Sequence, residues 1–121
     1  MDNKQKVLLV VMADVDPKHE EDLNRWYNEE HLPMLLKVPG VLSARRYKVA
    51  PETESHGTSP TGRPQKYIAI YEHETTEVQN TEAYEKARST PWANRVRPYV
   101  KNLFRQFYVQ TFPPDDTKMP R

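Results

Sequence analysis

Two hydrophobic periods, one typical of strands and one typical of helices, follow each other along this chain in an order that few folds accommodate. The first segment, Val7–Ala13, is a nearly continuous apolar run and predicts a central strand covered on both faces. Helical spacing then begins at Asp16 and Pro17. The series continues with a strand at 41–49, a strand at 66–73, a helical region at 78–88 and a strand at 102–112.

The order of these elements is strand, helix, strand, strand, helix, strand. This is the order of the split βαβ, or ferredoxin-like, arrangement, in which two helices cover one face of a four-stranded sheet. A chain of 121 residues has room for one such domain and is too short for two independent cores. We therefore expect an α+β fold in which residues 1–121 form a single domain.

The first helix carries its own start and stop signals. Asp16 supplies an N-cap acceptor, and Pro17 fits the first helical position. Pro33 lacks the backbone donor that a helix interior needs, so the regular helix is predicted to end or kink near His31. Apolar residues recur at mostly helical spacing along this segment and give one apolar face: Leu23, Trp26, Tyr27, Met34 and Leu35.

Alternation within each predicted strand assigns its side chains to the two faces of the sheet. In the segment 41–49, Arg45 and Tyr47 share a face with Val41, whereas Arg46 lies on the opposite face. The other two segments group Tyr67, Ala69, Tyr71 and His73 on one face, and Leu103, Arg105, Phe107 and Val109 on one face.

The segment from Ala50 to Gln65 is rich in Pro, Gly, Ser, Thr and Glu and holds almost nothing that a core would bury. It predicts a long mobile loop. Loops of this length are uncommon inside compact domains. The loop is therefore either a lid or a tolerated insertion, and the insertion is the preferred interpretation.

Composition excludes several classes of function. The chain has no cysteine, which removes disulfides, thiolate nucleophiles, iron–sulfur clusters and cysteine zinc sites. Its net charge of +1 is too small for a nucleic-acid binder. Its three glycines form no phosphate-binding loop, so no nucleotide cofactor is expected. A mean hydropathy of −0.92 and an N-terminus without an apolar stretch predict a soluble, cytoplasmic protein that does not cross a membrane.

The four histidines are scattered over separate elements, and no His-x-x-x-His or Glu-x-x-His pair occurs. We therefore expect no metal site, since only a convergence of His31, His73 and a carboxylate in space would create one.

Two helices on one face leave the other face of the sheet open. In a chain this small, an open face with aromatic side chains is usually covered by a second copy. We therefore expect a homodimer that buries this face and encloses a cavity.

Four sequence segments resemble the dimeric α/β-barrel superfamily, and in particular its EthD-like proteins. They are Trp26-Tyr27-Asn28-Glu29-Glu30-His31-Leu32-Pro33 followed by Val38-Pro39-Gly40, Arg45-Arg46-Tyr47, Lys66-Tyr67-Ile68-Ala69-Ile70-Tyr71-Glu72, and Ser89-Thr90-Pro91-Trp92. The resemblance extends over Val7–Phe112 and implies a ferredoxin-like domain that forms a dimeric α/β barrel. The superfamily includes cofactor-free isomerases, cyclases, dehydratases and lyases, quinone-forming monooxygenases, haem enzymes and proteins without an assigned role.

Catalytic relatives commonly use a histidine and a tyrosine of the cavity as acid or base, which implies His31 and Tyr27 here. The leading hypothesis is a cofactor-independent lyase, isomerase or cyclase acting on a small apolar carbonyl or phenolic, aromatic or polyketide-like substrate. His31 would move the proton, and Tyr27 would donate a hydrogen bond to the developing oxyanion. The alternatives are a cofactor-free monooxygenase of phenols and a non-catalytic, stress-related dimer that binds a small molecule.

His31 and His73 each also have a simpler, structural interpretation. The spacing of four residues places Tyr27 and His31 on one helix face, yet His31 could equally cap carbonyls or pair with Glu30. The resemblance favours the functional role for His31. His73 shares a strand face with Tyr71, but strand ends are usually wet, so a surface position is preferred for His73.

Aromatic and basic side chains supply the remaining candidates. Arg45 and Arg46 point to opposite faces, so one of them faces the cavity or the interface, where a salt bridge between protomers is the preferred role. Most of the aromatic residues must be core, and the rest would line an apolar pocket. The candidate substrate-binding residues are Trp26, Arg45, Tyr47, Tyr67, Tyr71, His73, Trp92 and Phe107.

Overall fold

The computed structural model describes residues 6–50 and 64–114. Its strands are β1 (Val7–Val15), β2 (Val41–Lys48), β3 (Tyr67–His73) and β4 (Val100–Val109). They form one sheet in the order β2-β3-β1-β4, in which every neighbouring pair is antiparallel. The predicted α+β, ferredoxin-like arrangement is confirmed.

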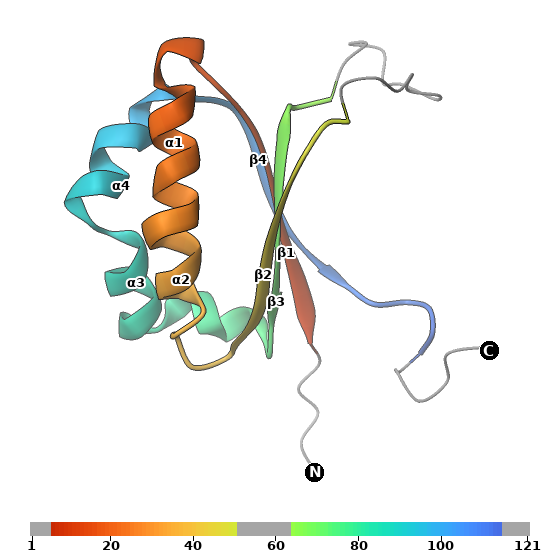
Figure 1. Cartoon of the computed structure of the whole chain (residues 1–121). Coiled ribbons are helices and arrows are strands. Elements are labelled where there is room, and N and C mark those ends of the chain that lie inside the picture. Colours follow the sequence, from red (N-terminus) through yellow and green to blue (C-terminus); the bar gives the residue numbers. More distant parts are fainter. Residues whose placement is uncertain (1–5, 51–63, 115–121) are drawn as a thin grey trace.

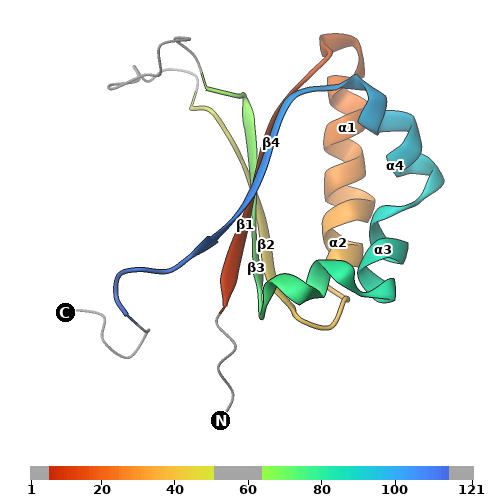
Figure 2. The same ribbon diagram turned by 180° about the vertical axis from the view of Figure 1, so that it is seen from behind.

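All helical segments pack on one face of this sheet, as Figures 1 and 2 show from opposite sides. The segments between β1 and β2 are η1 (Pro17–His19), α1 (Glu20–Trp26), η2 (Tyr27–His31) and α2 (Leu32–Leu35). Those between β3 and β4 are η3 (Thr76–Asn80), α3 (Glu82–Arg88), α4 (Pro91–Val96) and η4 (Arg97–Tyr99). The start signal read from the sequence is present, because the Asp16 side chain accepts a hydrogen bond from the Lys18 backbone N–H.

The regular helix is interrupted at Tyr27–His31, next to the break predicted near His31, but the chain does not leave the helix there. The helix continues from Glu20 to Leu35 and widens over Tyr27–His31 into a π-turn, where the Leu32 N–H donates to the Tyr27 carbonyl five residues earlier. The wider turn accommodates Pro33 without breaking the helix, since Pro33 has no N–H to place in the regular ladder.

A bulge near the start of β2 corrects the predicted alternation of this strand. Val41 pairs with His73, and Ser43, two residues later, pairs with the next residue, Glu72. The extra residue shifts the alternation of side chains between the two faces of the sheet by one position. Val41 is therefore buried on the helix-covered side, on the opposite face from Arg45 and Tyr47 instead of beside them.

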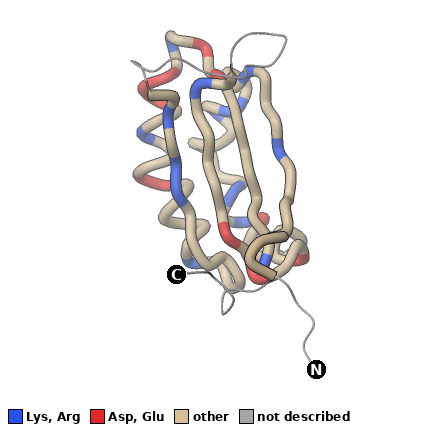
Figure 3. The backbone as a smooth tube through the Cα atoms, turned by 90° about the vertical axis from the view of Figure 1, so that its right-hand side faces the viewer, with Lys and Arg blue, Asp and Glu red and all other residues tan. Residues whose placement is uncertain are grey.

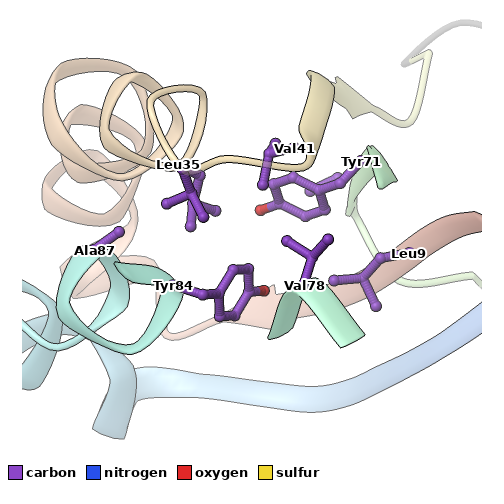
Figure 4. Packing of buried hydrophobic residues seen from close by; sticks show 9 residues of the cluster. Leu9, Leu35, Val41, Tyr71, Val78, Tyr84 and Ala87 are labelled. Atoms are coloured by element: carbon purple, nitrogen blue, oxygen red, sulfur yellow. The ribbon is translucent and has the colours of Figure 1, made fainter. Parts of the chain in front are cut away.

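Two groups of buried side chains hold the helices to the sheet. The larger group joins β1, β3, α2 and α3 (Figure 4) and comprises Leu9, Leu35, Val38, Val41, Ala69, Tyr71, Val78, Tyr84 and Ala87. The smaller group joins α1 to α4 through Leu23, Trp26, Ala93 and Val96. Gly40 closes the connection to β2 with a φ of +96°, and a Cβ there would lie 2.5 Å from a methyl group of Val78.

The other face of the sheet carries no helix and is turned to the viewer in Figure 3, where most of each strand is uncharged. By strand register this open face presents apolar side chains from all four strands: Leu8, Val10, Met12, Tyr47, Ile68, Ile70, Phe104 and Tyr108. Among them Leu8, Tyr47, Phe104 and Tyr108 are exposed.

Most of the predicted loop at 50–65 and the C-terminal tail from residue 115 lie outside the described residues. In the described ranges 6–50 and 64–114, none of the helices combines the length and hydropathy that crossing a membrane requires.

Candidate active site

A pocket of about 230 Å³ lies inside the single chain, between the helical layer and the sheet. It is therefore on the opposite side of the sheet from the open face, where the sequence analysis expected two copies to enclose a cavity. The walls combine apolar, aromatic and basic side chains: Leu9, Val11, Trp26, Tyr27, His31, Tyr71, Tyr84, Arg88, Arg97, Val100, Leu103 and Arg105.

The π-turn brings three rings of the first helix together at this pocket. In a regular helix a residue five positions later is rotated by roughly 140°, whereas the wider turn returns it to nearly the same direction. His31 thus stacks on Trp26, with ring centroids 4.2 Å apart and planes 16° from parallel. Tyr27 meets His31 edge-on, with centroids 5.4 Å apart.

His31 is buried, and its Nδ1 has no hydrogen-bond partner within residues 6–50 and 64–114. Glu30, the salt-bridge partner considered from the sequence, instead accepts hydrogen bonds from the Trp26 indole and the Thr90 hydroxyl. Burial disfavours the charged imidazolium, and the nearby guanidinium groups of Arg97 and Arg88 repel it. Together they lower the pKa of His31 to about 3. The imidazole is therefore neutral at pH 7.

Tyr27 is held between the imidazole and a guanidinium. The Arg46 guanidinium carbon lies 4.1 Å from the centroid of the Tyr27 ring and 4.3 Å from that of Tyr67. Arg46 Nη1 donates a hydrogen bond to Asn24 Oδ1 at 2.7 Å, which fixes the guanidinium. Burial raises the pKa of Tyr27 above its usual value despite the positive charge of Arg46. Tyr27 is thus a protonated hydrogen-bond donor at neutral pH.

Two further phenols line the pocket from opposite layers. Tyr71 comes from β3, and burial raises its pKa well above the usual value. Tyr84 comes from α3, and its hydroxyl is 3.5 Å from Nη2 of Arg105. Figure 4 shows these two rings facing each other between α2, α3 and the sheet.

The arginines of the pocket were not singled out as site residues from the sequence. Arg88 ends α3, Arg97 begins η4, and Arg105 projects from β4 on the same face as Phe107. The alternation of side chains along this strand had already placed Arg105 on the same face as Phe107, a candidate substrate-binding residue. The sequence therefore held a signal that could have identified Arg105. Nothing in the local pattern around Arg88 or Arg97 indicates that either side chain lines a cavity.

Of the candidates chosen from the sequence, the pocket brings together Trp26, Tyr27, His31 and Tyr71. Arg45 and Tyr47 are exposed on the open face, although Arg45 and Arg46 do point to opposite faces as expected. Tyr67 is buried outside this pocket, where its hydroxyl donates to Glu20 and accepts from Asn24.

Trp92 lies within the helical layer, away from the pocket walls. Its indole N–H donates to Asp22 at 3.1 Å, and the guanidinium groups of Arg25 and Arg95 lie over its ring. These contacts connect α4 to α1, so the structure gives Trp92 a packing environment.

His73 is fully buried, and the preferred surface position is therefore wrong. The strand end at His73 is covered because the register places it beside Val7 and Val41, while Tyr84 and Phe107 pack edge-on against its ring. Neither ring nitrogen has a hydrogen-bond partner in the described part of the chain, and burial lowers the pKa of His73. His73 and Phe107 belong to the packing beneath the pocket instead of its lining.

Within the part of the chain that the structure describes, no three His, Cys, Asp or Glu side chains cluster so that they could hold a metal ion. The polar groups of the pocket are an imidazole, three phenols and three guanidinium groups. Such groups bind and polarise an organic ligand or exchange protons with it.

A four-stranded antiparallel sheet with helices on one face, and a pocket between the two layers, defines a ferredoxin-like α+β protein with a small internal site. A family model described as a domain of unknown function, DUF4286, matches residues 6–111. The chain belongs to this family. No curated protein matches it significantly.

Solved structures share the fold at low sequence identity. An EthD family protein from Bacillus halodurans has 14% identity and a TM-score of 0.59, with 88% of this chain and 100% of that chain covered. A mutant of SnoaB, a cofactor-independent oxygenase from Streptomyces nogalater, has 16% identity and a TM-score of 0.54, with 90% and 98% covered. A DABB family protein with a ferredoxin-like fold from Mesorhizobium loti has 15% identity and a TM-score of 0.53, with 88% and 97% covered. These similarities support the EthD-like resemblance at the level of the fold.

Proposed function

We propose that this protein is a cofactor-independent enzyme that takes a small, mostly apolar carbonyl or phenolic substrate into the pocket and removes a proton from it through His31. The observation that carries the proposal is the cluster of Trp26, Tyr27 and His31 on the pocket wall. It combines a neutral imidazole with a protonated phenol in an apolar cavity. This combination can accept a proton and stabilise the charge that remains.

The proton transfer breaks an O–H bond of a phenol or a C–H bond next to a carbonyl. The electron pair stays on the substrate and spreads to its oxygen, while His31 becomes an imidazolium. Tyr27 keeps its proton and donates a hydrogen bond to the new oxyanion. Return of the proton to a different carbon would complete an isomerisation, and loss of a hydroxide as water would complete a dehydration.

A monooxygenase is the second candidate, and the fold shared with a protein named a cofactor-independent oxygenase favours it. A deprotonated phenol is electron-rich, and it could itself reduce O₂. In that reaction a ring C–H becomes a C=O, one oxygen atom enters the substrate and the other leaves as water. The first step, removal of a proton by His31, is the same in both candidates.

The test is a substrate screen with wild type, His31→Gln and Tyr27→Phe, in which product formation and O₂ uptake are recorded together. We expect His31→Gln to lower kcat by about a hundredfold or more, and Tyr27→Phe to lower it by a smaller factor. His19→Gln is the control, because His19 stacks on Tyr99 outside the pocket. O₂ uptake equal to product would select the monooxygenase. Full turnover by both pocket variants, or tight binding without turnover, would refute the catalytic role.

We also propose that a second copy covers the open face, as the EthD-like resemblance implies. Four strands about 4.8 Å apart and about eight residues long give an area of roughly 500 Å² in projection. The relief of the side chains increases this area toward the roughly 800 Å² that each partner of a stable dimer buries. The pocket would then remain inside each protomer.

A further inference from the structure

The geometry points to a substrate that carries a carboxylate, which the guanidinium groups of Arg97 and Arg105 bind while a compact apolar body fills the pocket. This inference rests on the proposed function, because it names the class of substrate for the same site. It starts from charge. Among the described residues, the pocket lining includes three arginines and no Asp or Glu.

Two of these arginines form no salt bridge in the described part of the chain, although Glu85, the partner of Arg88, also attracts the charge of Arg97. Arg88 is balanced by Glu85, with a nitrogen–oxygen distance of 3.6 Å. Arg97 and Arg105 form no such pair among the described residues. Arg97 is half-buried and Arg105 is exposed, and a guanidinium on a pocket wall can bind a carboxylate through two parallel N–H bonds. The unbalanced charge at Arg97 and Arg105 is therefore suited to an anionic ligand.

Arg97 is partly buried beside the cluster of Trp26, Tyr27 and His31. Its guanidinium carbon lies 5.3 Å from the centroid of the Trp26 ring, and Trp26 stacks on His31. Burial and the positive charge of Arg88 lower the pKa of Arg97, although a guanidinium remains charged near neutral pH. A carboxylate at this point would restore the charge balance and accept two parallel N–H bonds.

Arg105 approaches from the sheet, opposite the helical layer that carries Arg97. Its guanidinium carbon lies 5.5 Å from the centroid of the Phe107 ring, and its Nη2 contacts the Tyr84 hydroxyl at 3.5 Å. At that length the contact is weak, so the guanidinium keeps donors for a ligand. The two arginines thus face one pocket from its two layers.

Apolar side chains make up the rest of the wall and set the shape of the ligand. Leu9, Val11, Val100 and Leu103 line the same pocket. Its volume of about 230 Å³ is below the roughly 300–1,000 Å³ of pockets for drug-sized ligands. These features fit a small carboxylic acid with an aromatic or branched apolar body.

A bound carboxylate also changes the base. The charged groups that lower the pKa of His31 are Arg97 and Arg88, whereas the neighbouring Trp26 and Tyr27 rings are uncharged at neutral pH. A carboxylate on Arg97 offsets their repulsion of the imidazolium. The anionic substrate would therefore raise the proton affinity of His31 at the moment when the proton is transferred.

The experiment compares matched acid and amide probes: benzoate with benzamide, phenylacetate with phenylacetamide, and 2-naphthoate with 2-naphthamide. Dissociation constants are measured by ligand-detected NMR at pH 7 and low salt. We expect at least one acid to bind about tenfold or more tightly than its amide, as charge-assisted hydrogen bonds contribute at this level. Equal binding of every pair, or binding of no acid at millimolar concentration, overturns the proposal.

Arg97→Gln and Arg105→Gln test whether the preference comes from the pocket. Each is expected to remove most of the acid preference while leaving binding of the amide within about twofold. Arg25→Gln is the matched control, because Arg25 pairs with Glu29 on the exposed side of α1. A preference that survives both pocket variants overturns the proposal. Thermal melting of each variant verifies that it is folded. If Arg97→Gln unfolds, Arg105→Gln still tests the proposal, because Arg105 is exposed and its substitution disturbs no core packing.

His31→Gln separates this inference from the proposed function. The variant lacks the proposed base but keeps both arginines, so we expect it to retain the acid preference even without turnover. If His31→Gln kept both the acid preference and full turnover, the role of His31 as the base would be refuted and the carboxylate proposal would stand. If wild type showed no acid preference but its turnover still depended on His31, the carboxylate proposal would be refuted and the role of His31 would stand.

Discussion

At the scale of single residues, His31 is the proposed base of the site. Its imidazole is stacked on Trp26 and lies beside the Tyr27 ring, and its Nδ1 has no hydrogen-bond partner among the described residues. A buried polar atom without a partner costs about 1–3 kcal/mol. An apolar side chain of similar size would pack against Trp26 without this cost.

The protonation state of His31 can be measured directly. Burial and the charges of Arg97 and Arg88 lower its pKa to about 3, so its ring signals are expected to stay constant from pH 8 to pH 5 in NMR spectra of the folded protein. Unfolded chain in urea serves as the reference, because its histidines titrate near pH 6.5. A midpoint for His31 between pH 6 and 7 in the folded protein would contradict the buried, neutral state.

The same depressed pKa predicts how stability depends on pH. Below about pH 6.5 the unfolded chain binds a proton at this position and the folded chain does not, so the free energy of unfolding falls as the pH falls from 6.5 toward 3. One such group contributes a slope of up to about 1.4 kcal/mol per pH unit. His31→Phe, which keeps a ring against Trp26, should reduce the slope in urea titrations at pH 7, 6 and 5.

His73 provides the comparison for that experiment. It is also buried with a lowered pKa, so His73→Phe should reduce the slope in the same direction. A wild-type free energy of unfolding that does not change between pH 7 and 5 would contradict both assignments.

At the scale of elements, the π-turn decides which side chains of the first helix share a face. Leu23 and Leu35 are both buried, yet twelve regular helical steps would place them roughly 120° apart. One extra residue absorbed in the turn reduces this difference to roughly 20°. The turn therefore lets both ends of the helix pack on the sheet while Tyr27 and His31 face the pocket.

Removing the extra residue tests this interpretation. Deletion of the exposed Asn28 together with Pro33→Ala should give a regular helix that keeps Leu23 and Leu35 in phase, with a melting temperature within a few degrees of wild type. Insertion of one alanine after Asn28 should rotate Leu35 out of the core and lower stability by about 2–5 kcal/mol, the range for losing a buried leucine. Melting followed by circular dichroism compares the two. If the deletion variant unfolded while the insertion variant stayed stable, the interpretation that the π-turn absorbs one extra residue would be contradicted.

At the scale of the whole molecule, the two faces of the sheet differ in what covers them. The helix-covered face carries the pocket, and the open face presents apolar side chains from all four strands. Contiguous exposed apolar surface of this size marks an interaction surface in soluble proteins. The separation of the two faces means that assembly and chemistry can be tested independently.

Light scattering after size exclusion tests the proposed dimer. Wild type is expected to have twice the chain mass of 14.3 kDa, whereas Leu8→Glu should give a monomer, because it places a charge on the open face beside Tyr108. Leu36→Glu is the matched control, since Leu36 is an exposed leucine just after α2. A monomeric wild type would refute the dimer, and the pocket would still be complete within one chain.

Several features of the site were accessible from the sequence because they depend on local rules. The Asp16 cap and the strand parity that groups Tyr71 with His73 follow from period and side-chain chemistry. The EthD-like resemblance singled out Tyr27 and His31, and both line the pocket. The position of His73 could not be predicted, because a strand end is buried or wet according to what the helices and the neighbouring strands place over it.

By itself the sequence determined the α+β class and the order of the elements, because hydrophobic period and helix signals act within a few residues of each other. Tyr27 and His31 were implied by the resemblance. Only the tertiary structure decided the rest. The bulge at the start of β2 and the π-turn at Tyr27–His31 each accommodate one extra residue. Each lets the side chains on both sides of it pack against the core, where regular spacing would turn some of them away. Arg88, Arg97 and Arg105 belong to three elements, and they meet at one pocket because the helices and the sheet fold over the same space.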